Sequence, residues 1–209
     1  MARRSSRPDL LRQALAREAA RLMIEHGIED YGLAKRKAAS RLGVADRAAL
    51  PNNLEIEAAL AEHQRLFGPA EHEQELEAMR RAALEAMRLL CGFQPRLVGP
   101  LLAGTATAHS VITLHLFADT PERVAVLLLD RGIPYEVAER RLRYQRDTVE
   151  TCPAIRFTAG DYEVDAVIFP PEGIRQAPLG PVDGRPMRRA TPEELAALVG
   201  GPPSQAAAG

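Results

Sequence analysis

The spacing of apolar residues changes near Gly92, and this change limits the folds open to the chain. Before Gly92, apolar residues recur every three or four positions, which is typical of one face of a helix. After it come short runs rich in β-branched residues, such as Val111 to Phe117. The sequence therefore predicts an α+β fold, with a helical N-terminal region followed by a mixed β-sheet with flanking helices. The two clearest helical stripes are Leu11, Leu15, Ala19 and Leu22, and Leu76, Met79, Ala83, Met87 and Leu90.

Local signals place the ends of several helices. Gly27 fits the left-handed residue that ends a first helix, and a second helix is predicted from about Tyr31 to Leu42. Asn52 with Glu55 forms a capping box for a third helix, and Thr191-Pro192-Glu193-Glu194 begins the last one. We expect a helical region over 1–70, a second domain over 71–200 and a disordered tail over 201–209.

The second half of the chain contains most of the strand signals. Thr120-Pro121 resembles a helix start and Arg131-Gly132 its end. Three strands follow, with Gly160-Asp161 as a turn between the last two. The residues from 170 to 189, rich in Pro, Gly and Arg, are predicted to form a loop. The three strands are predicted at about 135–145, 154–158 and 162–169.

Composition excludes several classes of protein. The chain has 46% hydrophobic and 26% charged residues, which is typical of a globular protein. No apolar run approaches the length of a membrane span, so no membrane partner is expected. Cys91 and Cys152 lack the spacing of a metal site, and a reduced cytoplasmic setting is predicted. All but two of the 27 basic residues are Arg, which suggests a bacterial source.

The N-terminal region is locally basic although the net charge of the chain is only -1. Residues 1–50 hold 11 Arg or Lys against 6 Asp or Glu. That surplus could bind RNA or an acidic protein. The alternative is a solvated helix face whose charge is balanced by the acidic stretch from Glu71 to Glu77.

The most informative stretch runs from Arg96 to Leu114. It resembles the signature of the nucleotidyltransferase superfamily of polymerase-β-like proteins, in which a short strand ends in Gly-Ser, a helical turn leads to a second Gly, and Ser-Asp-hydrophobic-Asp-Leu follows. Gly99, Gly104 and Ser110 take the two glycine positions and the serine position without a gap. In such a motif glycine lets backbone N–H groups approach a phosphate. Two carboxylates at alternate strand positions hold divalent metal ions.

The residues that carry the chemistry in that family are missing here. Pro100 stands where the resemblance implies serine, and Val111 and Thr113 stand where it implies the two aspartates. Valine cannot ligate Mg²⁺, and a neutral threonine is a poor substitute for a carboxylate. Two-metal nucleotidyl transfer is therefore not expected, and no cofactor is predicted.

A third carboxylate of the family lies on a later strand, where this chain has Asp165. Because His115 lies two residues after Thr113, both should share one face of their strand. Asp165 and His115 are thus the candidate catalytic residues of an alternative function. That alternative is an active nucleotidyltransferase with a rebuilt Mg²⁺ or Mn²⁺ site, to which Asp119 could also contribute.

Arginines gather on one predicted strand and in the late loop, and guanidinium groups bind phosphates well. We therefore expect a catalytically degenerate nucleotidyltransferase-like protein that binds or regulates, with a phosphate-bearing ligand such as a nucleotide, RNA or a protein as partner. The alternative for these arginines is a charged sheet edge that discourages aggregation. The predicted ligand-binding residues are Gly99, Gly104, Ser110, Thr113, Arg140 and Arg143.

Overall fold

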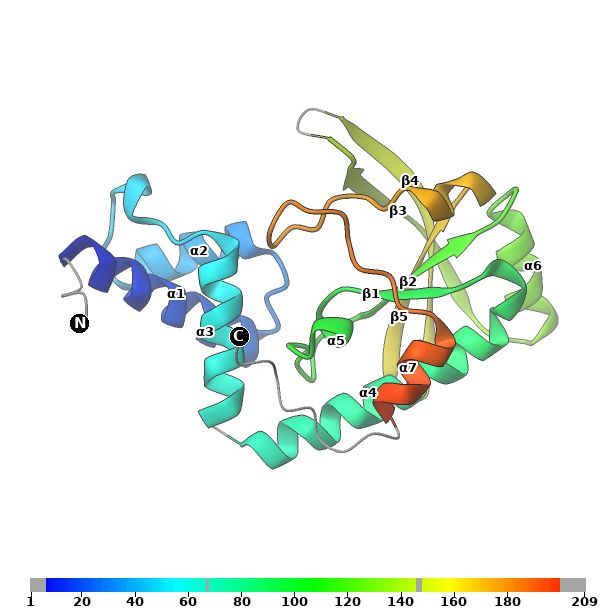
Figure 1. The fold of residues 1–209 in the computed structure, drawn as a ribbon, viewed down its shortest axis with the longest axis horizontal. Coiled ribbons are helices and arrows are strands. Elements are labelled where there is room, and N and C mark those ends of the chain that lie inside the picture. Colours follow the sequence, from blue (N-terminus) through cyan, green and yellow to red (C-terminus); the bar gives the residue numbers. More distant parts are fainter. Residues whose placement is uncertain (1–6, 67, 146–147, 200–209) are drawn as a thin grey trace. The chain divides into compact units, whose positions relative to one another are not determined.

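The computed structural model describes residues 7–66, 68–145 and 148–199, so the predicted tail at 201–209 lies outside the described residues. The chain divides into two compact units. The first unit comprises Met1–His72, Thr105–Ser110 and Pro181–Asp183, and the second comprises Glu73–Gly104, Val111–Gly180 and Gly184–Gly209. Figure 1 shows the course of the chain through both.

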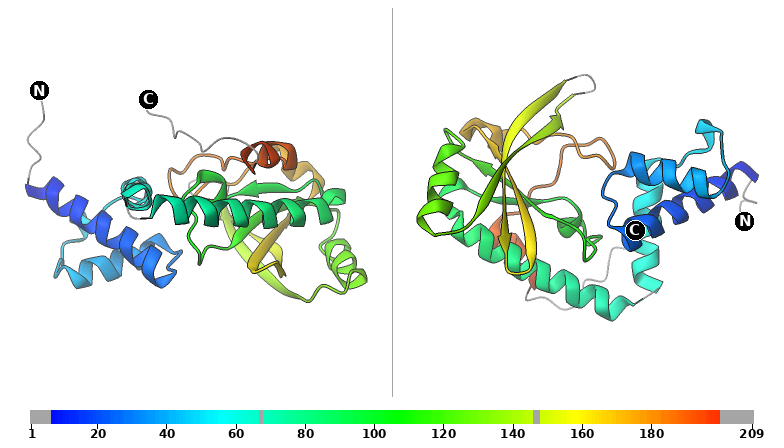
Figure 2. Two further views of the ribbon diagram at one scale, coloured as in Figure 1. Left: turned by 90° about the horizontal axis from the view of Figure 1, so that it is seen from below. Right: turned by 180° about the vertical axis from the view of Figure 1, so that it is seen from behind.

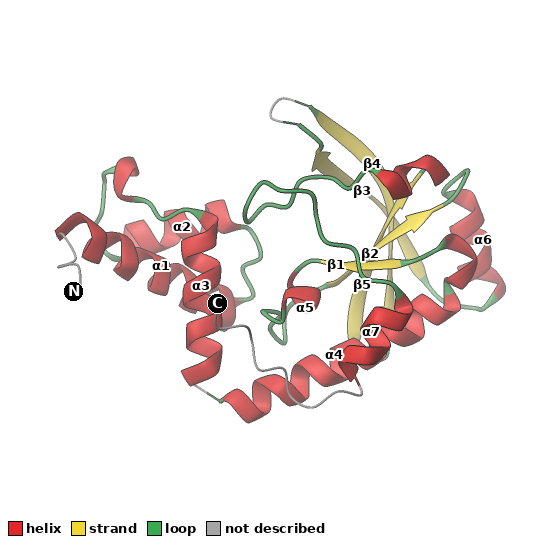
Figure 3. Ribbon diagram, viewed as in Figure 1, coloured by secondary structure: helices red, strands yellow, loops and turns green. Residues whose placement is uncertain are grey.

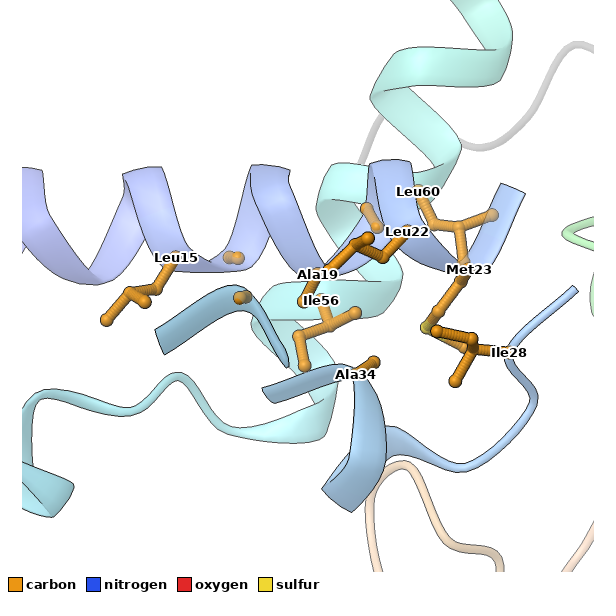
Figure 4. Close-up of a cluster of buried hydrophobic side chains, with 11 residues drawn as sticks. Leu15, Ala19, Leu22, Met23, Ile28, Ala34, Ile56 and Leu60 are labelled. Carbon is orange, nitrogen blue, oxygen red and sulfur yellow. The ribbon is translucent and has the colours of Figure 1, made fainter. Parts of the chain in front are cut away.

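In its described residues the first unit contains helices and loops, whereas all the strands belong to the second unit (Figure 3). Helix α1 packs against both α2 and α3. Their facing side chains form a buried apolar cluster around Leu15, Ala19 and Ile56 (Figure 4). The helices are α1 (Arg7–His26), α2 (Tyr31–Arg41), the short 3₁₀ helix η1 (Arg47–Ala49) and α3 (Asn53–Leu66).

The predicted helix signals in this unit are confirmed. Gly27 has φ of 61° after the last residue of α1, a conformation that glycine adopts without steric cost. The capping box is reciprocal: the Asn52 N–H donates to Glu55 Oε2 (2.7 Å), and the Glu55 N–H donates to Asn52 Oδ1 (2.8 Å). These bonds satisfy backbone N–H groups that the first turn of a helix leaves without partners.

The second unit is built around a five-stranded mixed sheet with the order β1-β2-β5-β4-β3. Strand β2 is parallel to β5, and the other neighbours are antiparallel. The α+β class predicted from the sequence is thereby confirmed. The strands are β1 (Arg96–Val98), β2 (Ile112–Phe117), β3 (Tyr135–Arg143), β4 (Val149–Ala159) and β5 (Tyr162–Phe169). Helix α4 (Pro69–Leu89) belongs to this unit from Glu73 onward. The other helices are η2 (Cys91–Phe93), α5 (Pro100–Ala103), α6 (Glu122–Asp130), η3 (Pro171–Arg175) and α7 (Pro192–Val199).

The two faces of this sheet differ in character. Because directly paired residues point to the same side, Thr113, Asp165 and Arg156 share one face. His115 and Val167 lie two residues further along β2 and β5 and therefore point to the same face. We call it the Asp165 face. The opposite face is wholly apolar at its centre, with Ile112, Leu114, Leu116, Val164, Ala166 and Ile168 all buried.

Two elements differ from the sequence prediction. Strand β4 starts at Val149, well before the predicted Ala154, and so runs through Pro153. Proline is tolerated because the ladder between β4 and β5 begins at Ala154, so the missing N–H removes no bond from it. Helix α6 begins at Glu122, one residue after the start predicted at Pro121. Pro121 is its N-cap, and there is no side-chain cap from Thr120. Figure 2 shows the paired β3–β4 ribbon from two further sides.

No helix in the described part of the chain is long and apolar enough to cross a membrane.

Candidate functional site

The turn between β1 and α5 holds Gly99, the first glycine of the motif. Gly99 has φ of 79° and ψ of -158°, a region that only glycine enters readily. Its carbonyl accepts hydrogen bonds from the N–H groups of Leu102 and Ala103, both at 3.1 Å. Pro100 has no N–H at all. Two donors of the turn are therefore used internally and Pro100 supplies none, which makes the turn a poor cradle for a phosphate.

Thr113 and Asp165 lie side by side on the Asp165 face, as direct partners in the parallel pairing of β2 and β5. Gly99 is close to the same point, because a Cβ built on it would lie 3.9 Å from Thr113 Oγ1. The structure thus brings together three of the predicted site residues. Gly104 is not one of them: it ends α5 in a left-handed conformation, and its N–H donates to the Pro100 carbonyl.

Two arginines surround the Asp165 carboxylate. Arg140 Nε, from β3, donates a hydrogen bond to Asp165 Oδ2. Arg156 Nε, from β4, lies 3.5 Å from Asp165 Oδ1 as an ion pair. The Asp165 side chain is only 4% exposed, whereas those of Arg140 and Arg156 are 32% and 38% exposed. A buried charge requires a partner, and here guanidinium groups neutralise the carboxylate.

The described residues contain no group of three or more His, Cys, Asp or Glu side chains placed to hold a metal ion. Asp119, a further candidate ligand, is exposed and forms an ion pair with Arg123 at 2.7 Å.

His115 has a different partner from the one considered in the sequence. Its Nδ1 accepts a hydrogen bond from Arg189 Nε at 3.0 Å, so the ring proton lies on Nε2. Burial, reinforced by the Arg189 charge, lowers the pKa of His115 from 6.5 to about 3. The described structure therefore pairs His115 and Asp165 each with arginine, rather than with one another.

Arg189 links the chain after β5 to the Asp165 face. Its Nη1 donates to the carbonyls of Gly173 (2.8 Å) and Ile174 (3.2 Å). Its Cζ lies 5.0 Å from the ring centroid of Phe117 and 5.2 Å from that of Phe169. Burial lowers the pKa of the guanidinium, which stays charged at neutral pH. Arg189 thus joins η3 to strands β2 and β5.

The predicted loop over 170–189 and the residue after it form hydrogen bonds with the two edge strands of the sheet. The Leu179 N–H donates to the Arg143 carbonyl at 2.6 Å, next to the end of β3. Ala190 pairs with Leu97 of β1 through two hydrogen bonds of 2.9 Å. The middle of this segment and the residue that follows it therefore lie at opposite edges of the sheet, and Arg189 fixes the segment to the Asp165 face.

His115 should make stability depend on pH. Its folded pKa of about 3 lies below the ordinary 6.5, so the unfolded chain binds more protons between these values. Its contribution is complete above pH 6.5 and falls as the solution is acidified. Between pH 6.5 and 5 we expect it to lower the free energy of unfolding by about 2 kcal/mol. His115→Gln should remove that part of the pH dependence in urea titrations; unchanged pH dependence would contradict a buried, neutral His115.

Ser110 lies in the first unit, in the loop from Thr105 to Ser110. Its hydroxyl accepts a hydrogen bond from the Thr107 N–H at 2.9 Å. The same loop is tied to α3, because Gln64 Nε2 donates to the Thr105 carbonyl (3.1 Å) and Thr105 Oγ1 donates to Glu57. Glu57 also accepts from the Tyr31 hydroxyl. Ser110 therefore has a local structural role in the first unit.

Arg143 does not join the cluster around Asp165. Three positions separate it from Arg140, so the two side chains leave β3 on opposite faces. Arg156 does join, although no local pattern in the sequence marks it as a site residue. Only the pairing of β4 with β5 places Arg156 opposite Asp165.

Part of the basic character of the N-terminal region is internally paired. Arg21 contacts Glu18 at 2.8 Å and Glu25 at 2.9 Å, and Arg41 contacts Glu18 at 3.1 Å. Such exposed pairs contribute little to stability, but they reduce the charge available to a partner.

No protein-family model matches the chain, and a search of curated proteins finds none that matches its sequence. The resemblance to nucleotidyltransferases therefore stays a hypothesis that rests on the residues from Gly99 to Leu114 and on Asp165.

Proposed function

We propose that this chain is a catalytically degenerate nucleotidyltransferase-like protein whose second unit binds a phosphate-bearing ligand without a divalent metal ion. The observation that carries the proposal is the arrangement around Asp165. One buried carboxylate is neutralised by two guanidinium groups, at a position that the resemblance assigns to a metal ligand.

The charges of this cluster favour an anion. Arg140 and Arg156 supply two positive charges against the single buried negative charge of Asp165. The other carboxylates of this face are exposed: Glu163 is 3.8 Å from Arg156 and half-exposed, and Glu136 is the partner of Arg156 in the pairing of β3 with β4. About a third of each arginine side chain is exposed, so a ligand can contact both while Asp165 stays paired. Guanidinium groups form charge-assisted, often bidentate hydrogen bonds with phosphate oxygens.

The polar atoms favour a ligand that also carries a hydroxyl. Asp165 Oδ1 and Arg156 Nε are buried, and neither forms a hydrogen bond with another described residue. A hydroxyl could donate to the first atom while a phosphate oxygen accepts from the arginines. A nucleotide or a phosphorylated sugar has both groups.

The alternative function, nucleotidyl transfer with a rebuilt site, would require Asp165 and His115 to lose their contacts with arginine side chains. Burial also keeps His115 neutral and bonded through Nδ1. Charge balance likewise opposes it, since a single carboxylate offsets too little of the charge of two metal ions.

Isothermal titration with ATP, CTP, GTP and UTP, each with and without Mg²⁺, tests the proposal. We expect at least one nucleotide to bind equally well with and without the metal. Arg140→Gln should weaken that binding about tenfold, because it removes one charge-assisted hydrogen bond. Arg141→Gln is the matched control, since Arg141 is the next residue on β3 but lies on the other face. It should leave the affinity within about twofold of the original.

Two results would reject the proposal. The first is the absence of binding by all four nucleotides. The second is binding that requires Mg²⁺ and is accompanied by nucleotide transfer that Asp165→Asn abolishes, which would establish the alternative enzyme.

A further inference from the structure

The outer edge of β3 is open along most of its length. The Tyr144 N–H donates to the Thr148 carbonyl of the adjoining segment at 3.0 Å, so the even-numbered residues of β3 direct their backbone groups toward β4. The odd-numbered residues therefore direct theirs outward. Among the described residues, the only main-chain partner on this outer side is Leu179, at Arg143. Tyr135, Val137, Glu139 and Arg141 thus form an open edge.

The other edge of the sheet is closed, because Ala190 pairs with Leu97 of β1. Open strand edges are templates for pairing with another chain. Val137, at the middle of the open stretch, is 79% exposed, the highest value among the exposed large hydrophobic residues described. A partner strand would cover it.

We propose that the β3 edge pairs antiparallel with the β3 edge of a second copy of this chain, around a two-fold axis at Ala138. This register uses the open stretch from Tyr135 to Arg141 and stops before Arg143, where Leu179 already pairs. Two five-stranded sheets would then become one continuous sheet.

Charge complementarity favours a second copy of the chain as the partner of this edge, and it favours this register. With Ala138 on the axis, Glu136 of each copy lies opposite Arg140 of the other, and Tyr135 lies opposite Arg141. Val137 meets Glu139, and no like charges face each other. Moving the axis by one residue places either Glu139 or Val137 opposite itself, and both shifts lose the two Glu136–Arg140 pairs. Moving it by two places either Arg140 or Glu136 opposite itself. Directly opposed like charges destabilise strand pairs.

In this register Glu136 of the second copy would also approach Arg140, which donates a hydrogen bond to Asp165. The second copy would thus add a carboxylate to the candidate site. A single strand pair is a small interface, so we expect a dimer that depends on concentration rather than a permanent one. The two-fold arrangement uses the same edge in both copies and therefore stops at two.

Sedimentation velocity of the full chain, from low micromolar to several hundred micromolar, tests the proposal. We expect the mass to rise with concentration from one copy to two and no further. Val137→Pro removes an outward N–H at an edge position that tolerates proline, and should keep the chain monomeric. Val137→Thr retains that N–H and should still dimerise.

A charge variant tests the register. Glu136→Lys places two lysines opposite the two Arg140 side chains and should abolish dimerisation, whereas Glu122→Lys on the exposed surface of α6 makes the same charge change elsewhere and should not. Circular dichroism of each variant reports whether the fold is retained. A chain that stays monomeric throughout the range would overturn the proposal, and so would a dimer that survives both Val137→Pro and Glu136→Lys.

Discussion

Replacing Phe169 with alanine is expected to lower the free energy of unfolding of the second unit by about 4 kcal/mol. Phe169 is 1% exposed and lies at the end of β5 on the Asp165 face. Its ring centroid is 4.7 Å from that of His115 and 5.9 Å from that of Phe117. The substitution removes these contacts together with the cation–π contact to Arg189, and it leaves a cavity between β5 and η3.

Phe169→Leu is the matched control, because it keeps most of the volume and should cost only about 1 kcal/mol. Urea unfolding followed by tyrosine fluorescence measures both variants. Three of the four tyrosines, Tyr135, Tyr144 and Tyr162, lie in the second unit, so the signal reports mainly on that unit. Equal losses in the two variants would show that Phe169 is not packed as described.

Replacing Asp165 with alanine is expected to lower the free energy of unfolding of the same unit by about 3 kcal/mol. The carboxylate is buried, and its removal leaves Arg140 and Arg156 close together without a counter-charge. Part of the cost is relieved because both arginine side chains are about one-third exposed and can turn toward water.

Glu163→Ala provides the comparison, since Glu163 is two residues earlier on β5 but 53% exposed, with Arg156 at 3.8 Å. We expect it to change stability by less than about 0.5 kcal/mol. Thermal unfolding at neutral pH and low salt measures both. If Asp165→Ala proved as mild as Glu163→Ala, the ion pairs around Asp165 would not contribute to the stability of the fold.

Local signals in the sequence were sufficient to predict most helices and strands. Asn52 with Glu55, and Thr191 with Glu194, form the predicted capping boxes. Strand β5 has the predicted bounds, and the turn at Gly160 has the positive φ that a tight hairpin requires. These features depend on residues within four positions of one another, and a single sequence contains that information directly.

The environment of the candidate site could not be predicted in the same way. Arg189 and His115 are 74 residues apart, and no local pattern indicates that they meet. The pairing of Arg156 with Asp165 follows from the register of β4 and β5, which the turn at Gly160 and the burial of one sheet face set together. The sequence identified Asp165 as a candidate but could not show which charges would surround it.

The pairing of Ala190 with Leu97 has a consequence for the order of events during synthesis. The ribosome releases β1 long before it releases Ala190, so the outer edge of β1 stays open while the rest of the sheet emerges. His115 likewise lacks its hydrogen-bond donor until Arg189 has been released. The second unit can therefore reach its final packing only when nearly all of its residues have left the ribosome, whereas helices α1 to α3 can pack much earlier. Pulse-labelled nascent chains stalled before residue 185 should remain sensitive to protease in the sheet.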